Sequence, residues 1–150
     1  MFNQRSKLEV AAFFAVFIII IIFLSTKAYP SKLILGGKLF NIEVVDTKKL
    51  LEKGLSGHKP LLEDEGMFFV FQKEDLYGFW MKDMSFSIDI LWIDSNFKIV
   101  HIEKSLSPET YPKIFYPKTK AHYVLEISAG EANKLDIKIG DSIKFIKNSS

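Results

Sequence analysis

The chain contains no cysteine, and this absence excludes several classes of chemistry. Without a thiol there is no disulfide, no thiolate nucleophile, no cysteine-ligated zinc and no iron–sulfur cluster. A lipid anchor attached through a cysteine is excluded for the same reason. Sequence evidence on targeting therefore has to come from the N-terminal residues.

The common sequence signatures of enzymes and metal sites are also missing. No phosphate-binding loop, dinucleotide fingerprint, G-x-S-x-G or H-E-x-x-H pattern occurs. The three histidines, His58, His101 and His122, do not have the spacing of metal ligands. We therefore expect no metal and no cofactor, and a binding role is favoured over an enzymatic one.

An excess of positive charge is missing from most of the chain. Arg5, Lys7 and Lys27 are the basic residues that precede residue 29, and Glu9 is the acidic one. Of the 20 basic and 18 acidic residues, 17 of each sign therefore lie in residues 29–150. A protein that binds nucleic acid normally carries a basic surface that neutralises several phosphates. Nucleic acid is therefore not an expected partner.

One long hydrophobic run is present, at residues 10–24. As a helix it would be about 22 Å long, and Ser25 and Thr26 can extend it towards the bilayer core thickness of about 30 Å. Arg5 and Lys7 precede the run, so the positive-inside rule places the N-terminus in the cytoplasm and the remaining chain outside. We expect a single-pass protein of the cytoplasmic membrane.

Two interpretations of this leader remain open. It is either an uncleaved signal anchor or a cleaved signal peptide, in which case the protein is secreted. Bulky residues at the end of the run and Lys27 within the candidate cleavage site favour the anchor. The predicted organisation is a cytoplasmic N-terminus at 1–9, a transmembrane segment at 10–28, a linker and first strand at 29–37, and a β-rich extracytoplasmic domain at 38–150.

Short β-rich segments dominate the rest of the chain. The pattern predicts strands at 32–35, 38–45, 67–71, 77–81, 83–92, 98–103, 121–128 and 141–147. Short helices are expected at 47–53 and 129–135, and the proline-rich segment 104–120 is expected to be an irregular binding loop. The predicted fold is mainly β: a small antiparallel β-sandwich or barrel-like domain with one or two short helices, preceded by an N-terminal transmembrane helix.

Several short motifs follow one another in an order that is similar to a known family. They are K-G-L at 53–55, E-D-E-G-M-F-F-V-F at 63–71, F-W-M-K-D at 79–83, I-D-I at 88–90, Y-V-L-E-I-S-A-G at 123–130 and I-K-I-G-D at 137–141. Over residues of about 40–145 the chain resembles domain of unknown function family 192. The resemblance implies a compact β-fold that is often exported and has no established activity.

Four positions depart from the pattern of that family. Ser56 and His58 stand where the family usually has Met and Arg. Asp83 and Met84 stand where it usually has Asn and Thr. Whatever these positions do in relatives is altered here.

Three charged residues are the candidates for catalysis. Asp89 and Glu126 lie on predicted strands among apolar neighbours, where an uncompensated charge is costly. Lys82 precedes the strand of Asp89 and could form an ion pair with it. If Asp89 and Glu126 faced one cleft, they could act as the acid and base of a hydrolase; a structural ion pair is the other interpretation of Asp89.

Four aromatic residues are the candidates for ligand binding. Phe79 and Trp80 are either core residues or a platform on which a sugar stacks, and Tyr111 and Tyr116 belong to the irregular loop. Together with the leader, they predict a membrane-tethered extracytoplasmic module that binds or assists an envelope component. The expected partners are the lipid bilayer, through residues 10–28, and a cell-envelope saccharide or protein. A small envelope hydrolase that uses the carboxylate pair is the alternative.

Overall fold

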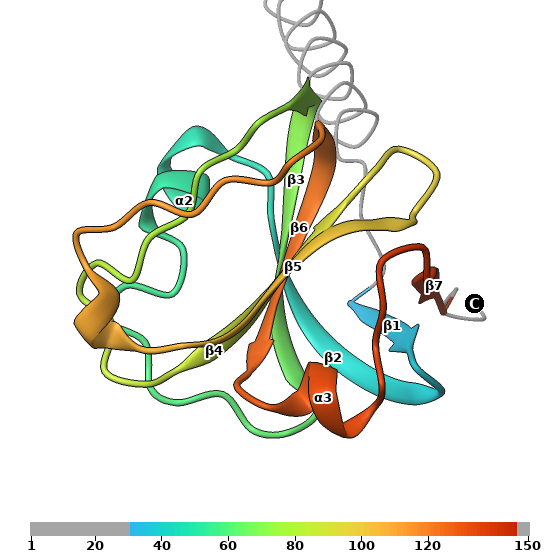
Figure 1. Ribbon diagram of the computed structural model, residues 1–150, viewed down its shortest axis with the longest axis horizontal. Coiled ribbons are helices and arrows are strands. Elements are labelled where there is room, and N and C mark those ends of the chain that lie inside the picture. The colour runs from blue at the N-terminus through green and yellow to red at the C-terminus, as the bar shows by residue number, and fades with distance from the viewer. Residues whose placement is uncertain (1–30, 147–150) are drawn as a thin grey trace, which may run out of the picture.

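Seven strands form one curled sheet in the computed structural model, which describes residues 31–146 (Figure 1). Their order across the sheet is β5-β4-β6-β3-β2-β1-β7. In chain order the strands are β1 Lys32–Leu35, β2 Lys38–Val45, β3 Glu65–Asp75, β4 Ile88–Ile93, β5 Ile99–Leu106, β6 Ala121–Ser128 and β7 Lys144–Phe145. The helices of the described residues are α2 Lys48–Lys53, the 3-10 helix η1 Pro108–Thr110 and α3 Glu131–Lys134.

Neighbouring strands are antiparallel except for β2 and β3, which are parallel. α2 lies in the crossover between these two strands, as a parallel pair requires. The two edges of the sheet also meet at one end. There the Ile99 N–H donates to the Asp141 carbonyl at 2.8 Å, and the Ile143 N–H donates to the Phe97 carbonyl at 3.0 Å. The sheet is therefore curled into a half-barrel.

The turn between β1 and β2 depends on two glycines. Gly36 and Gly37 have φ angles of 57° and 81°, which residues with a Cβ rarely adopt. Gly36 also lies against the chain that leads to β7, where an added Cβ would be 2.6 Å from the Ile137 Cδ1 atom. The glycine pair thus connects the two predicted strands as a hairpin and allows this close approach.

The inside of the curl holds one of two apolar clusters. This cluster draws side chains from all seven strands, and Phe40, Phe68 and Leu125 are fully buried in it. Burial of such side chains is the main source of stability for a sheet of short strands. The inner face is therefore a packed core.

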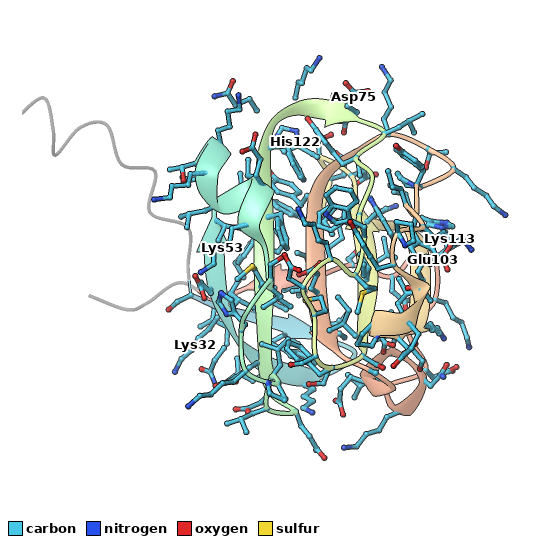
Figure 2. The ribbon with its side chains drawn as sticks, turned by 90° about the vertical axis from the view of Figure 1, so that its left-hand side faces the viewer. Lys32, Lys53, Asp75, Glu103, Lys113 and His122 are labelled. Atoms are coloured by element: carbon cyan, nitrogen blue, oxygen red, sulfur yellow. The ribbon has the colours of Figure 1, made fainter. Side chains whose placement is uncertain are left out.

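The second apolar cluster lies on the outer face of β3, β4 and β6. Phe69, Trp92 and Val124 are buried there. α2 and the irregular segments 76–87 and 107–120 cover this face, on the left in Figure 1, and Figure 2 shows side chains filling the space on both faces of the sheet. Because the cover is made of loops and one short helix, a cleft can form beneath it.

The predicted mainly β fold with one or two short helices is confirmed. Of the two predicted arrangements the barrel-like one is closer, because the strands form a single curled sheet rather than a two-sheet sandwich, and the β2–β3 pair is parallel rather than antiparallel. All residues of β4 are buried, so both of its faces are covered. The predicted membrane segment at 10–28 lies outside the described residues. Within residues 31–146, no helix has the length and apolar character needed to cross a bilayer.

The predicted strand at 77–81 is wrong, and the one at 83–92 begins too early. In the first segment Phe79 makes only an isolated bridge with Phe115. β4 begins at Ile88, because Asp83 has a φ of 55° that interrupts the extended chain. Two rings of the first segment pack on the outer face of the sheet: Phe79 lies edge-on against Phe69 and Trp92, and Tyr77 stacks on Phe71. Their apolar character reflects this cover and not strand pairing.

Candidate functional site

Asp89 and Glu126 lie on neighbouring strands but point to opposite faces of the sheet. In the register of β4 and β6, Asp89 is paired with Ile127, and Ile90 is paired with Glu126. Directly paired residues share a face, and successive residues alternate between faces. Asp89 therefore points into the curl and Glu126 points to the outer face, so the two do not form a carboxylate pair.

Asp89 is fully buried and is held by backbone groups rather than by Lys82. Its Oδ1 accepts hydrogen bonds from the N–H groups of Ser105 at 2.7 Å and Gly130 at 3.1 Å, and its Oδ2 accepts one from Ala132 at 2.8 Å. These bonds tie the end of β5 to the start of α3. Asp89 is therefore a structural anchor, because its acceptor capacity is used within the fold.

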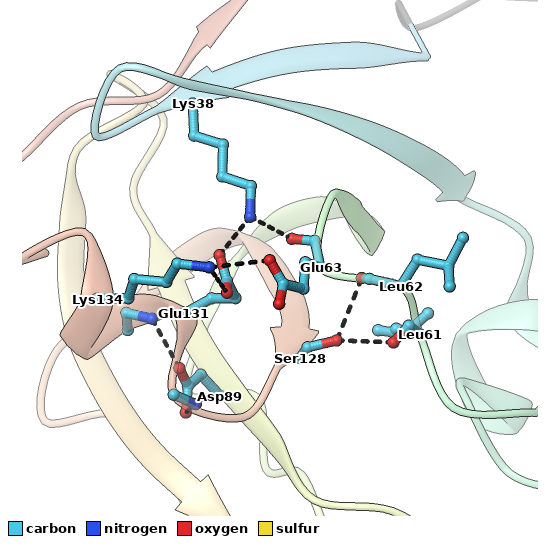
Figure 3. Close-up of polar contacts among 10 residues, drawn as sticks. Lys38, Leu61, Leu62, Glu63, Asp89, Ser128, Glu131 and Lys134 are labelled. Atoms are coloured by element: carbon cyan, nitrogen blue, oxygen red, sulfur yellow. Dashed lines mark hydrogen bonds and ion pairs between the residues drawn. The ribbon is translucent and has the colours of Figure 1, made fainter.

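A chain of ion pairs lies close to this anchor (Figure 3). Lys38, in the strand after the first turn, pairs with Glu131 of α3 at 2.5 Å, and Lys134 pairs with Glu63 at 2.8 Å. Lys134 lowers the pKa of Glu63 by a hydrogen bond and by its charge. The network joins the first hairpin, the loop before β3 and α3, and its groups are already paired.

Glu126 lies at a small cavity under the cover of the outer face. The inner cavity, as we call it, has a volume of about 110 Å³ and is lined by residues 51–56 at the end of α2, by β3, by residues of the segment 77–84 and by Glu126. Glu126 is 4% exposed, and its Oε2 has no hydrogen-bond partner among the described residues. Burial raises the pKa of Glu126 to about 8, because a charged carboxylate loses its hydration there.

Five aromatic side chains line the inner cavity. They are Phe69 and Phe71 of β3 and Tyr77, Phe79 and Trp80 of the covering segment. Phe71 stacks on Tyr77, while Phe69 and Phe79 meet edge to face with centroids 4.9 Å apart. A carboxyl group without a partner is thus enclosed by rings, and the exposed charges at the same cavity are Glu52 and Lys53 of α2.

A wider groove continues from the inner cavity to the surface. This outer groove has a volume of about 800 Å³ and shares Leu51, Glu52, Phe71, Gly78 and Trp80 with the inner cavity. Its remaining lining includes Gln72, Ile114 and Tyr116. Trp80 and Tyr116 are 45% and 55% exposed, so large aromatic surfaces face solvent at this groove.

Backbone hydrogen bonds hold the covering segments in place. Phe79 and Phe115 exchange N–H to carbonyl bonds of 2.9 and 2.8 Å, and the Trp92 indole N–H donates to the Tyr77 carbonyl at 2.8 Å. Gly78 lies so close to the other segment that a Cβ would be 2.5 Å from the Tyr116 ring. The segments 77–81 and 114–116 therefore form one rigid wall of the cleft.

Residues 32–145 match the domain of unknown function family 192 (DUF192), which is described as an uncharacterized ACR. The chain belongs to the DUF192 family. The resemblance predicted from the short motifs is confirmed, and the match begins at β1, slightly before the predicted limit.

The chain is also similar to individual proteins of known sequence or structure. The UPF0127 protein PH1112 of Pyrococcus horikoshii is 34% identical to this chain over 70 residues. These residues are 47% of this chain and 55% of that protein, so the chain spans about half the length of this relative. A crystal structure of a protein of unknown function from Novosphingobium aromaticivorans is similar with a TM-score of 0.71 and 27% identity, over 77% of this chain and 84% of that one. A crystal structure of a putative transcription regulator from Sinorhizobium meliloti has a TM-score of 0.70 and 25% identity, over 79% and 97% of the two chains.

Two of the four departures from the DUF192 pattern line the same inner cavity. Ser56 and Met84 are both at its wall, so a hydroxyl replaces a thioether at one position and a thioether replaces a hydroxyl at the other. Asp83 has a φ of 55°, a conformation that Asn and Asp both tolerate, so this replacement preserves the turn. His58 lies apart from the cavity, in a separate groove with Ser31 and Pro60.

The predicted aromatic candidates of this DUF192 chain come together at the cleft, whereas the predicted charged ones do not. Phe79 and Trp80 line the inner cavity, Tyr116 lines the outer groove, and the Tyr111 ring lies 5.8 Å from that of Trp80. Lys82 lies over the outer side of the same indole, with its Nζ 5.6 Å from the ring centroid.

Sequence reasoning did not identify Glu52, Lys53 and Tyr77 as site residues, although Lys53 begins the K-G-L motif, because they meet Glu126 only through the fold. Among residues 31–146, no group of three or more acidic or histidine side chains is placed to hold a metal ion. Among the charged residues that line the inner cavity, Glu126 is the buried one.

Proposed function

We propose that this protein is a ligand-binding module of the cell envelope, tethered to the cytoplasmic membrane by residues 10–28 with its β-domain outside the cytoplasm. The observation that carries the binding role is the unpartnered carboxyl of Glu126 at the inner end of a cleft with aromatic walls. Small-molecule sites are usually clefts of this kind, apolar with a few buried polar groups. The membrane location is supported by the hydrophobic run and by Arg5 and Lys7 before it.

The carboxyl of Glu126 destabilises the folded protein because it has no hydrogen-bond partner, and a bound ligand can reduce this destabilisation. A buried polar group without a partner destabilises a folded protein by roughly 1–3 kcal/mol. An apolar residue at position 126 would fill the space without that cost, so a purely structural role explains Glu126 poorly. A ligand that donates a hydrogen bond to its Oε2 recovers part of the cost on binding.

The outer groove suits an envelope saccharide. Its volume of about 800 Å³ lies within the range of roughly 300–1,000 Å³ that is common for small-ligand sites. The exposed rings of Trp80 and Tyr116 offer flat apolar surfaces against which the C–H face of a sugar can pack. Gln72 and Glu52, at the same groove, can bond to hydroxyl groups.

The Sinorhizobium protein is described as a putative transcription regulator, but the charge of this chain does not support a role in DNA binding. Residues 29–150 contain equal numbers of basic and acidic residues. The cleft is lined by both signs, with Lys48 and Lys53 beside Asp46 and Glu52. Such a surface does not provide the phosphate neutralisation that DNA requires.

The hydrolase alternative loses its carboxylate pair, because Asp89 and Glu126 face opposite sides of the sheet. Lys82 lies over Trp80 and not beside either carboxyl. Glu52 is the remaining carboxylate at the inner cavity, and its side chain is largely exposed. The binding function therefore has the stronger support.

Titration of the full-length protein with envelope saccharides tests the proposal. Purified protein in maltoside micelles is mixed with soluble peptidoglycan fragments and other envelope glycans, and tryptophan fluorescence is followed. Trp92 is fully buried and Trp80 is half-exposed, so a ligand in the outer groove should change the Trp80 emission. Calorimetry on Trp80→Ala should then give roughly 5- to 150-fold weaker binding, since a stacked aromatic ring contributes about 1–3 kcal/mol.

A matched control separates the cleft from the general surface. Ile139 is 64% exposed and lies at neither the inner cavity nor the outer groove, so Ile139→Ala should bind the ligand as the wild type does. Absence of a response to every envelope fraction, or full binding by Trp80→Ala, would refute the proposed function. Protease digestion of intact spheroplasts tests the location, because an external domain is cleaved without lysis.

A further inference from the structure

The size of the inner cavity restricts what can enter it. A volume of about 110 Å³ equals that of roughly three or four waters at about 30 Å³ each. The cavity therefore accepts one small group at the end of a ligand, while the body of that ligand lies in the outer groove. Glu126 is the buried polar side chain that this group meets.

The charge of the inner cavity is negative when Glu126 is ionised. Its charged lining residues are Glu52 and Lys53 from α2 and Glu126 from β6. No ion pair joins Lys53 to Glu126 in the described part of the chain, and Figure 2 shows the Lys53 side chain at α2. An anionic group would be repelled, whereas a cation would supply the missing counter-charge.

The aromatic walls favour the same sign of charge. The faces of Phe, Tyr and Trp rings carry partial negative charge and attract cations that lie within about 6 Å of the ring centre. Phe71 and Tyr77 form a stacked pair at the wall, and Trp80 lies at the junction with the outer groove. A metal ion would need several oxygen ligands, and Glu126 alone does not provide them. An organic ammonium group gains from both the rings and the carboxylate.

We propose that the inner cavity binds the ammonium group of an organic cation, a primary amine or a quaternary ammonium, whose charge compensates Glu126. This proposal rests on the binding function proposed above and specifies the chemistry of the inner end of the ligand. The rings enclose the cation, the carboxylate neutralises it, and the remainder of the ligand occupies the outer groove.

Binding of a permanent cation should become tighter as the pH rises. Burial raises the pKa of Glu126 to about 8, so the free protein holds this carboxyl mainly protonated at pH 6 and mainly ionised at pH 9. The other titratable groups that face the cavity are Glu52 and Lys53 from α2 and Tyr77 from the covering segment, and burial raises the pKa of Tyr77 away from this range. Because only the ionised carboxylate pairs with the cation, the apparent affinity follows its population.

Choline and 3,3-dimethyl-1-butanol form a matched pair of probes, since they have the same shape and differ in charge. Calorimetry uses the full-length protein in maltoside micelles, which contain no competing ammonium group. We expect the choline affinity to rise at least about tenfold from pH 6 to pH 9, with no such change for the neutral alcohol. Glu126→Gln should weaken choline binding at pH 9 at least tenfold and abolish the pH dependence. Glu43→Gln, an exposed position on β2 away from the cleft, should behave as the wild type.

The outcomes distinguish this proposal from the proposed function. Equal choline binding by the wild type and Glu126→Gln at pH 9, or no choline binding at millimolar concentrations, overturns the ammonium proposal. If envelope saccharides still bind in a Trp80-dependent manner in that case, the binding function stands without it. The pH dependence of the wild type needs no variant, so the test remains decisive even if Glu126→Gln were to misfold.

Discussion

Replacement of Glu126 by glutamine should stabilise this protein increasingly as the pH rises. Burial raises the pKa of Glu126 from 4.5 to about 8 in the folded protein. Each pKa unit corresponds to about 1.4 kcal/mol, so ionisation of the carboxyl in the folded state costs on the order of 5 kcal/mol relative to the unfolded chain. Glutamine has nearly the same shape and carries no charge, so it avoids this cost.

The cost develops over a defined pH range. Below pH 4.5 the carboxyl is protonated in both the folded and the unfolded states, and its contribution to stability is fully present. Between pH 4.5 and about 8 the unfolded chain releases the proton while the folded protein retains it, so the free energy of unfolding falls as the pH rises. Above about pH 8 both states are ionised and the loss is complete. The stability difference between Glu126→Gln and the wild type should therefore grow by on the order of 4 kcal/mol from pH 5 to pH 9.

Urea unfolding of the full-length proteins between pH 5 and pH 9, followed by tryptophan fluorescence, measures this difference. Subtraction of the wild-type curve removes the titration of all other groups that the two proteins share. Glu43→Gln, at an exposed position, should change stability by less than about 0.5 kcal/mol at every pH. A difference between Glu126→Gln and the wild type that is constant with pH would refute the reasoning, as would an NMR titration of the Glu126 carboxyl carbon near pH 4.5.

Two further substitutions test the anchor and the wall of the cleft. Asp89→Ala removes the acceptor of three backbone N–H groups and should lower the free energy of unfolding by roughly 3–5 kcal/mol. Hydrogen exchange at the Ala132 amide should also become faster. If that amide stayed protected, Asp89 would not be the anchor. Gly78→Ala places a Cβ 2.5 Å from the Tyr116 ring and should cost about 1–3 kcal/mol through overpacking. Thermal unfolding measures that cost, and an unchanged transition would show that the two covering segments are not rigidly packed.

Local sequence patterns predicted the elements whose conformation depends on nearby residues. The glycine pair at 36–37 specifies the first hairpin, because both positions require positive φ. β6 has the predicted bounds, and α2, at Lys48–Lys53, agrees to within one residue with the predicted helix at 47–53. These features depend on residues that are close together in the sequence.

Local sequence patterns gave wrong predictions where a segment packs on the sheet without being a strand of it. Residues 77–81 are apolar because their rings cover the sheet, and this appearance is the same as that of a buried strand. Leucine is typical of a buried helix face, yet Leu50 is 38% exposed and α2 contains no buried residue. The sequence does not predict either feature, because each depends on the surface against which residues 77–81 or α2 pack.

Composition and motif order alone established that this is a cysteine-free, mainly β member of the DUF192 family with a charge-balanced domain. Only the tertiary structure decided the faces of Asp89 and Glu126. Both faces of β4 and of β6 are buried. The order of residue types along either strand therefore does not reveal to which face of the sheet a given side chain points. Their orientation is set by the register between β4 and β6, which are separated in the sequence by β5 and the loop after it. This register turns Asp89 towards backbone N–H donors and leaves Glu126 without a partner in an aromatic cavity.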